Sequence, residues 1–177
     1  MDATTTTWAL ATAVGLTAGW VDWRSRRIPN WLTVSGAVIG IAFHTFHAGW
    51  MGASVGLMGM FLALICLLPL VLLRAMGAGD WKLMAALGAI LGPVKMLIVL
   101  AGAILVSGVI GMVMIIRARR VKETFMNVFL LVQGFFSFGL RSCPEITLDN
   151  PGLLKLPFGV ATAVATVLCF LATQWKW

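Results

Sequence analysis

The feature that most constrains the fold is a long stretch without charge: from Trp31 to Leu73 the chain contains no Asp, Glu, Lys or Arg. A soluble domain of this size could not bury such a stretch, whereas about 20 apolar residues are enough to cross a bilayer as a helix. Charged residues make up only 11% of the chain, and soluble domains carry roughly 25%. The sequence therefore predicts an all-α, polytopic membrane protein with a single integral-membrane domain over residues 1–177.

Apolar runs and turn residues divide the chain into about six transmembrane helices. We expect them at residues 4–21, 31–46, 51–73, 81–91, 94–116 and 156–175. The fourth helix would be only about 17 Å long, so the residues before it should lie partly within the membrane, buried by protein. Residues 124–140 are uncharged and place Phe125, Phe129, Val132 and Phe136 on one side, which favours an amphipathic helix lying on the membrane over another span. We expect residues 141–155 to form a polar linker.

The distribution of positive charge predicts the orientation of these helices. A net charge of +7 could indicate nucleic-acid binding, but the cations lie in short loops beside apolar runs, which is the pattern of cytoplasmic loops. With the N-terminus outside, all Lys and Arg residues except Lys95 and Lys176 fall on the cytoplasmic side. We therefore expect the lipid bilayer, and no nucleic acid, as a partner.

The segment Gly77-Ala78-Gly79-Asp80 is the strongest candidate for a functional site. A carboxylate beside hydrocarbon loses its hydration, and the two glycines would let another helix approach it closely. The predicted topology places Asp22 at the same membrane face, so we expect it to be the partner of Asp80. Two such carboxyl groups tend to share a proton, and the pair can activate water and polarise a peptide carbonyl without a metal or another cofactor.

Simpler roles compete with this interpretation. Asp22 could be a polar residue at a helix end, paired with Arg24 or Arg26, and Asp80 could cap the following helix. Lys82 would point away from Asp80 on a regular helix, and could anchor the protein at the membrane surface or contact a substrate. The chain could also be a small transporter or proton relay that uses both aspartates, or a non-catalytic scaffold subunit of a secretion system. A relay is disfavoured because both acids lie at one predicted face.

Three motifs resemble those of the type IV prepilin peptidase family. Asp22-Trp23-Arg24 through Ile28-Pro29-Asn30 resembles the family's D-x-R-x-x-x-I-P-N signature, Gly77 to Lys82 matches GxGDxK, and Pro157-Phe158-Gly159 resembles P-[YF]-G. The resemblance implies an intramembrane aspartic endopeptidase of the bacterial inner membrane that cuts leader peptides from prepilins or pseudopilins at the cytoplasmic face. It implies that Asp22 and Asp80 are catalytic, with support from Arg24, Pro29, Asn30, Gly77, Gly79, Lys82, Pro157 and Gly159.

The resemblance also bears on the branch of the family. Larger members carry a cytoplasmic insert with paired CxxC motifs, which is linked to N-methylation of the new N-terminus. This chain contains no such insert, so we do not expect N-methyltransferase activity. Its small size is similar to that of the Flp/Tad-type members, which implies a Flp/Tad-type prepilin as substrate.

Overall fold

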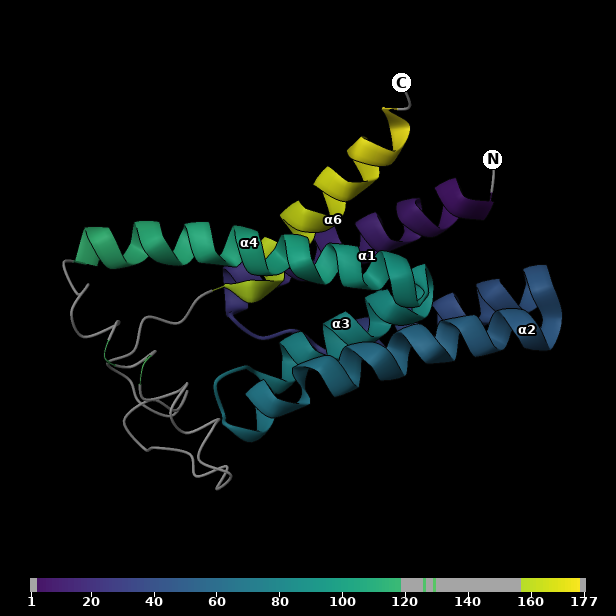
Figure 1. The fold of residues 1–177 in the computed structure, drawn as a ribbon, viewed down its shortest axis with the longest axis horizontal. Helices are drawn as coiled ribbons and strands as arrows, with labels where there is room; N and C mark the ends of the chain where they lie inside the picture. Colours follow the sequence, from purple (N-terminus) through teal and green to yellow (C-terminus); the bar gives the residue numbers. More distant parts are fainter. Residues whose placement is uncertain (1–2, 119–125, 127–128, 130–156, 176–177) are drawn as a thin grey trace.

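The computed structural model describes residues 3–118, 126, 129 and 157–175. Within this part of the chain the secondary structure is entirely α-helical, which confirms the predicted all-α class (Figure 1). The helices in chain order are α1 (Ala3–Ser25), α2 (Asn30–Leu72), α3 (Ala78–Leu91), α4 (Pro93–Ala118) and α6 (Phe158–Gln174).

Helix α2 is a hairpin rather than one straight rod. As a continuous helix its 43 residues would be about 64 Å long, twice the thickness of a bilayer core. The helical backbone breaks at Ala48 and Gly49, and Gly49 has a φ of 55°, which glycine adopts readily. Across the break the two arms run back along each other, and a Cβ at Gly56 would lie 3.4 Å from Ile41 Cα. The predicted helices at 31–46 and 51–73 correspond to these two arms (Figure 1).

Helix α3 is the centre of the bundle, because it contacts all four other described helices. Its residues 83–91 are all buried, and the side chains of Leu83, Met84 and Leu87 are completely inaccessible. Small residues bring the neighbouring helix close: Gly88 faces Gly59 of α2 directly, backbone against backbone. This close approach is typical of membrane bundles, where dispersion contacts rather than hydrophobic exclusion hold helices together.

Two helix boundaries differ from the predicted ones. Helix α3 begins at Ala78 rather than at residue 81, because Gly77 is its N-cap and the Trp81 N–H already donates to the Gly77 carbonyl, at 3.2 Å. The Gly77–Asp80 motif therefore forms the first turn of a helix rather than a loop. Helix α1 continues to Ser25, four residues beyond its predicted end at residue 21, so Asp22 is helical. Helices α4 and α6 lie within two residues of the predicted bounds 94–116 and 156–175.

The apolar surface of the bundle identifies a membrane protein. Helices α2 and α4 are long and apolar enough to cross a bilayer, yet only 22% and 17% of their most apolar windows are buried inside the protein. A core helix of a soluble protein would be mostly buried, whereas these helices expose large side chains such as Phe46, Trp50 and Leu105. Lipid is the surrounding that fits such a surface. The count of six spans stays a prediction, and the predicted interfacial helix 124–140 and linker 141–155 lie outside the described residues apart from Met126 and Phe129.

Candidate active site

Three helix ends meet at one end of the bundle and bring the predicted site residues together. Helix α1 ends there with Asp22 in its last turns, α3 begins there with Asp80 in its first turn, and α6 begins there after Pro157 (Figure 1). Asp22 is buried, with only 7% of its surface exposed, and Asp80 is half-buried. Both lie outside the two helices that qualify as membrane spans by length and composition.

Asp22 is held by the backbone of α6. The Gly159 N–H donates a hydrogen bond to Asp22 Oδ2 at 3.0 Å, in a buried setting. Burial raises the pKa of the Asp22 carboxyl, while hydrogen bonds from the backbone of Gly159 and Val160 and the positive charge of Arg26 act in the opposite direction. Arg26 directly follows α1, and its backbone N–H donates to the main-chain carbonyl of Asp22 at 2.9 Å.

Asp80 lies three residues after the N-cap of α3. That N-cap is Gly77, so Asp80 is not the capping residue of this helix, and a Cβ at Gly77 would lie 3.3 Å from Asp80 Oδ2. Burial, and then the negative charge of Asp22, raise the pKa of Asp80 to about 7. The structure thus brings two carboxyl groups from distant parts of the chain close enough to influence each other's ionisation.

A hydrogen bond joins the first two motifs. The Lys82 ammonium donates to the Asn30 side-chain carbonyl, Oδ1, at 3.0 Å, at an exposed position. Asn30 is the first residue of α2, and Pro29 occupies the N-cap position of this helix with an extended backbone. Lys82 was expected to act as a surface anchor or to contact a substrate. Its contact here ties the start of α2 to the start of α3, beside Asp80.

Two contacts of the α3 N-terminus were not predicted from the sequence. The indole N–H of Trp81 donates to the Leu64 carbonyl of α2 at 2.9 Å, which fixes the residue next to Asp80. A Cβ at Gly79 would lie 3.3 Å from Ile28 Cβ, so this glycine packs against the loop after α1 rather than against the first helix itself. The position of Trp81 between two motif residues was the available signal for its role. Ile28 offered none.

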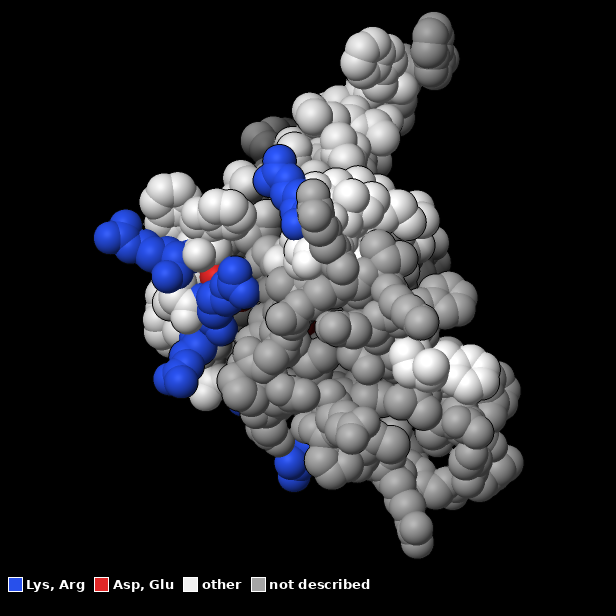
Figure 2. Space-filling model, turned by 90° about the vertical axis from the view of Figure 1, so that its left-hand side faces the viewer, with Lys and Arg blue, Asp and Glu red and all other residues white. Residues whose placement is uncertain are grey.

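Positive charge surrounds this end of the bundle. Figure 2 shows Lys and Arg side chains gathered on it, with a small acidic patch between them. The described cations next to the helix ends that meet here are Arg24, Arg26, Arg27, Arg74, Lys82 and Arg117. Lys95 lies at the opposite end of the bundle, where its ammonium donates to the Thr7 hydroxyl at 3.4 Å. The described cations are therefore segregated toward the two aspartates.

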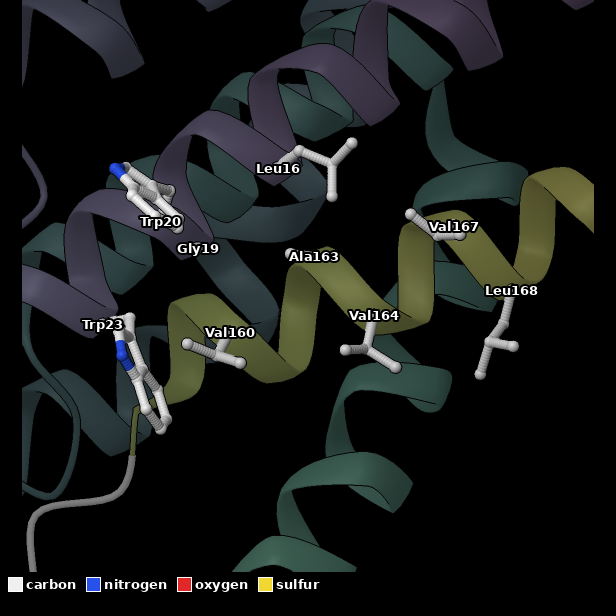
Figure 3. A pocket seen from close by; sticks show the side chains of 9 residues that line it. All are labelled: Leu16, Gly19, Trp20, Trp23, Val160, Ala163, Val164, Val167 and Leu168. Carbon is white, nitrogen blue, oxygen red and sulfur yellow. The ribbon is translucent and has the colours of Figure 1, made fainter.

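An apolar groove runs between α1 and α6 next to this site (Figure 3). It has a volume of about 480 Å³ and is open to the surroundings. Its lining includes Trp23, which follows Asp22, and Val160, whose backbone contributes to the hydrogen bonding of Asp22. An apolar surface thus begins directly beside a buried carboxyl group.

The chemistry that this arrangement can support is acid–base catalysis by paired carboxyl groups. Within the described ranges, no group of three or more His, Cys, Asp and Glu residues is placed to hold a metal ion. Asp22 and Asp80 come from the first two motifs, and Pro157 and Gly159 of the third lie at the start of α6, against Asp22. Arg24 is exposed in the last turn of α1.

Comparison with known proteins identifies the family. The model of the type IV leader peptidase family matches residues 9–112, which is more than half of the chain and includes both aspartates. Searches of curated proteins and of solved structures found no match. The family consists of proteases of the prepilin peptidase kind. The chain therefore belongs to the type IV leader peptidase family.

Proposed function

We propose that the protein is an intramembrane aspartic endopeptidase, with Asp22 and Asp80 as its catalytic pair. Its substrate would be a Flp/Tad-type prepilin, cut at the cytoplasmic face of the bacterial inner membrane. The observation that carries the proposal is the meeting of the two carboxyl groups, from α1 and α3, at the polar end of an apolar bundle. Such a meeting costs free energy, because two like charges in a partly dehydrated place repel each other. Carboxyl pairs of this kind are typical of functional sites.

The pair can hydrolyse a peptide bond when it holds one proton. The ionised carboxylate accepts a proton from a water molecule, whose oxygen forms a bond to the carbonyl carbon of the leader peptide. The protonated carboxyl donates its proton to the carbonyl oxygen, which stabilises the tetrahedral intermediate. On collapse, the carbon–nitrogen bond breaks, the departing amine takes the proton that the first carboxyl accepted from water, and the re-forming carbonyl returns its proton to the second carboxyl, so the pair is again singly protonated.

The choice of membrane face follows from charge. Loops rich in Lys and Arg stay on the cytoplasmic side, and the described cations other than Lys95 gather at the end that holds the two aspartates. The choice of a Flp/Tad-type substrate rests on the resemblance and on the lack of paired CxxC motifs in this sequence.

A proton relay would be expected to carry ionisable groups along the crossing path. In the described residues the carboxylates are Asp22 and Asp80, and both lie at one end. The position of the two acids therefore favours hydrolysis at a surface over transport.

The test is cleavage by the purified protein. The protein is reconstituted into lipid vesicles with a Flp-type prepilin, and the products are identified by mass spectrometry. We expect one cut that releases the leader, and no cut when the residues flanking the scissile bond are replaced in the substrate. Proton flux across the same vesicles, without any cleavage, would contradict the proposal and support a relay.

A further inference from the structure

The N-terminus of α6 is directed at Asp22. The first N–H groups of a helix have no acceptor within the helix, and the helix dipole places partial positive charge there. Here Gly159 uses its free N–H to bind Asp22 Oδ2 at 3.0 Å, and the backbone N–H of Val160 also contributes. Pro157, at the N-cap, has no N–H to place there, and it starts the helix so that the following donors face the carboxylate.

Gly159 is the residue that allows this approach. A Cβ at this position would lie 2.9 Å from both Cβ and Oδ2 of Asp22, and 3.1 Å from its Cγ. Ordinary contacts of that kind are at least about 3.5 Å. Any side chain at this position would push the carboxyl away from the two N–H groups. The third motif therefore has a physical role at the site, although it lies far from Asp22 in the sequence.

The two aspartates have unequal surroundings. Burial raises the pKa of the Asp22 carboxyl, but this carboxyl also receives two backbone N–H groups from α6 and lies near Arg26, just after its own helix, and these three favour its charged form. The carboxyl of Asp80 is partly buried and lies near the negative charge of Asp22. Both effects favour its neutral form and raise its pKa. Of the helices that pack against α1, α6 and α2 carry no Asp, Glu, Lys or Arg, and α3 contributes Asp80 itself and the exposed Lys82.

We propose, building on the function proposed above, that Gly159 is a positioning residue which keeps Asp22 ionised, and that Asp80 carries the proton of the pair. Asp22 then accepts the proton of the attacking water as the new oxygen–carbon bond forms. Asp80 donates its proton to the carbonyl oxygen of the leader peptide. When the carbon–nitrogen bond breaks, the amine takes the proton now held by Asp22, and the carbonyl oxygen returns its proton to Asp80.

Gly159→Ala tests the positioning role, with Gly19→Ala as a matched control. Both substitutions add a Cβ to the contact between α1 and α6, but the one at Gly19 meets Ala163 Cβ at 2.7 Å and the Gly159 carbonyl oxygen at 3.3 Å rather than the Asp22 carboxyl. Gly159→Ala should reduce kcat and move the acidic limb of the kcat/KM profile up by about one pH unit, since Asp22 becomes harder to ionise. Gly19→Ala should leave the position of that limb unchanged. Equal profiles for the two variants would overturn the positioning role.

Infrared spectroscopy tests the proton assignment without relying on turnover. Slightly below neutral pH, the protein in vesicles should show a protonated-carboxyl C=O band that is lost in Asp80→Asn. In Asp22→Asn the band should persist and titrate at a lower pH, because Asp80 no longer faces a negative charge. A band lost in Asp22→Asn and retained in Asp80→Asn would overturn the assignment.

The cleavage assay keeps this inference distinct from the proposed function. If both asparagine variants are inactive but the infrared band belongs to Asp22, the protease function stands and the assignment fails. If either variant still cleaves prepilin, the aspartic mechanism itself fails, and with it the catalytic roles assigned to the two carboxyl groups.

Discussion

Replacement of Gly88 by alanine should push α3 away from α2 and reduce prepilin cleavage, although Gly88 lies outside the candidate active site. A Cβ at Gly88 would lie 2.7 Å from the carbonyl carbon of Gly59 and 3.1 Å from the backbone N of Met60. These are backbone atoms, which cannot move aside as a side chain can, so the helices must shift by roughly 0.5–1 Å to reach ordinary contact distances. Overpacking of this kind costs about 1–3 kcal/mol.

The consequence for function follows from the position of Gly88 on the helix that carries Asp80. The two residues are about 12 Å apart along α3, so a shift of the helix moves the Asp80 carboxyl relative to Asp22. A misplacement of about 1 Å at a catalytic group can cost on the order of 100-fold in rate. We expect a loss of at least tenfold in prepilin cleavage and a lower melting temperature in detergent.

Gly108→Ala is the matched control for this experiment. Gly108 lies within α4, is exposed, and has nothing within 4 Å of the added Cβ. The same gain in helix propensity therefore occurs there without a clash, and we expect unchanged cleavage and a stability that is equal or slightly higher. If Gly88→Ala cleaves prepilin within twofold of Gly108→Ala and melts at the same temperature, then α3 does not position Asp80 through this contact.

Three further predictions follow from the same geometry. Gly79→Leu should abolish cleavage while the protein still inserts into the membrane, because a Cβ there already lies 3.3 Å from Ile28 Cβ; full activity would remove the close-packing argument. Cysteines near Arg24, Arg74 and Arg119 should react with an impermeant reagent only from the cytoplasm, and labelling from outside intact cells would reverse the topology. Cleavage should decline as the pH rises through about 7, because Asp80 then loses the proton that the pair needs; constant activity well above that pH would contradict a shared proton.

The fold class and the helix positions could be predicted because they depend on local pattern. The uncharged stretch after Asn30 predicted two helices, and glycine at position 49 lies where the structure reverses α2. The predicted C-terminal end of α1 and the predicted start of α3 were wrong by four and three residues. Hydrophobicity marks where lipid begins, whereas a helix ends where its backbone hydrogen bonding stops. Asp22 and Asp80 both lie in these extra turns.

The contacts around the aspartates were harder to predict because many of them use backbone groups. The bonds from Gly159 to Asp22 and from Trp81 to Leu64 each use a main-chain donor or acceptor, so no pair of residue types announces them. The contact of Lys82 with Asn30 depends on two helix starts lying side by side, which is a property of the packed bundle. Motif resemblance marked these positions as important without indicating what they touch.

The most direct test of the account is cleavage by Asp22→Asn, Asp80→Asn and the double variant, each checked for membrane insertion. Asparagine keeps the shape of the side chain but can neither accept the proton of water nor share one. Either single change should stop leader cleavage, and the double variant should be no worse than either single, because removal of half of a catalytic unit already removes the unit. Substantial cleavage by either well-inserted single variant would contradict the central claim that the two aspartates form one catalytic pair.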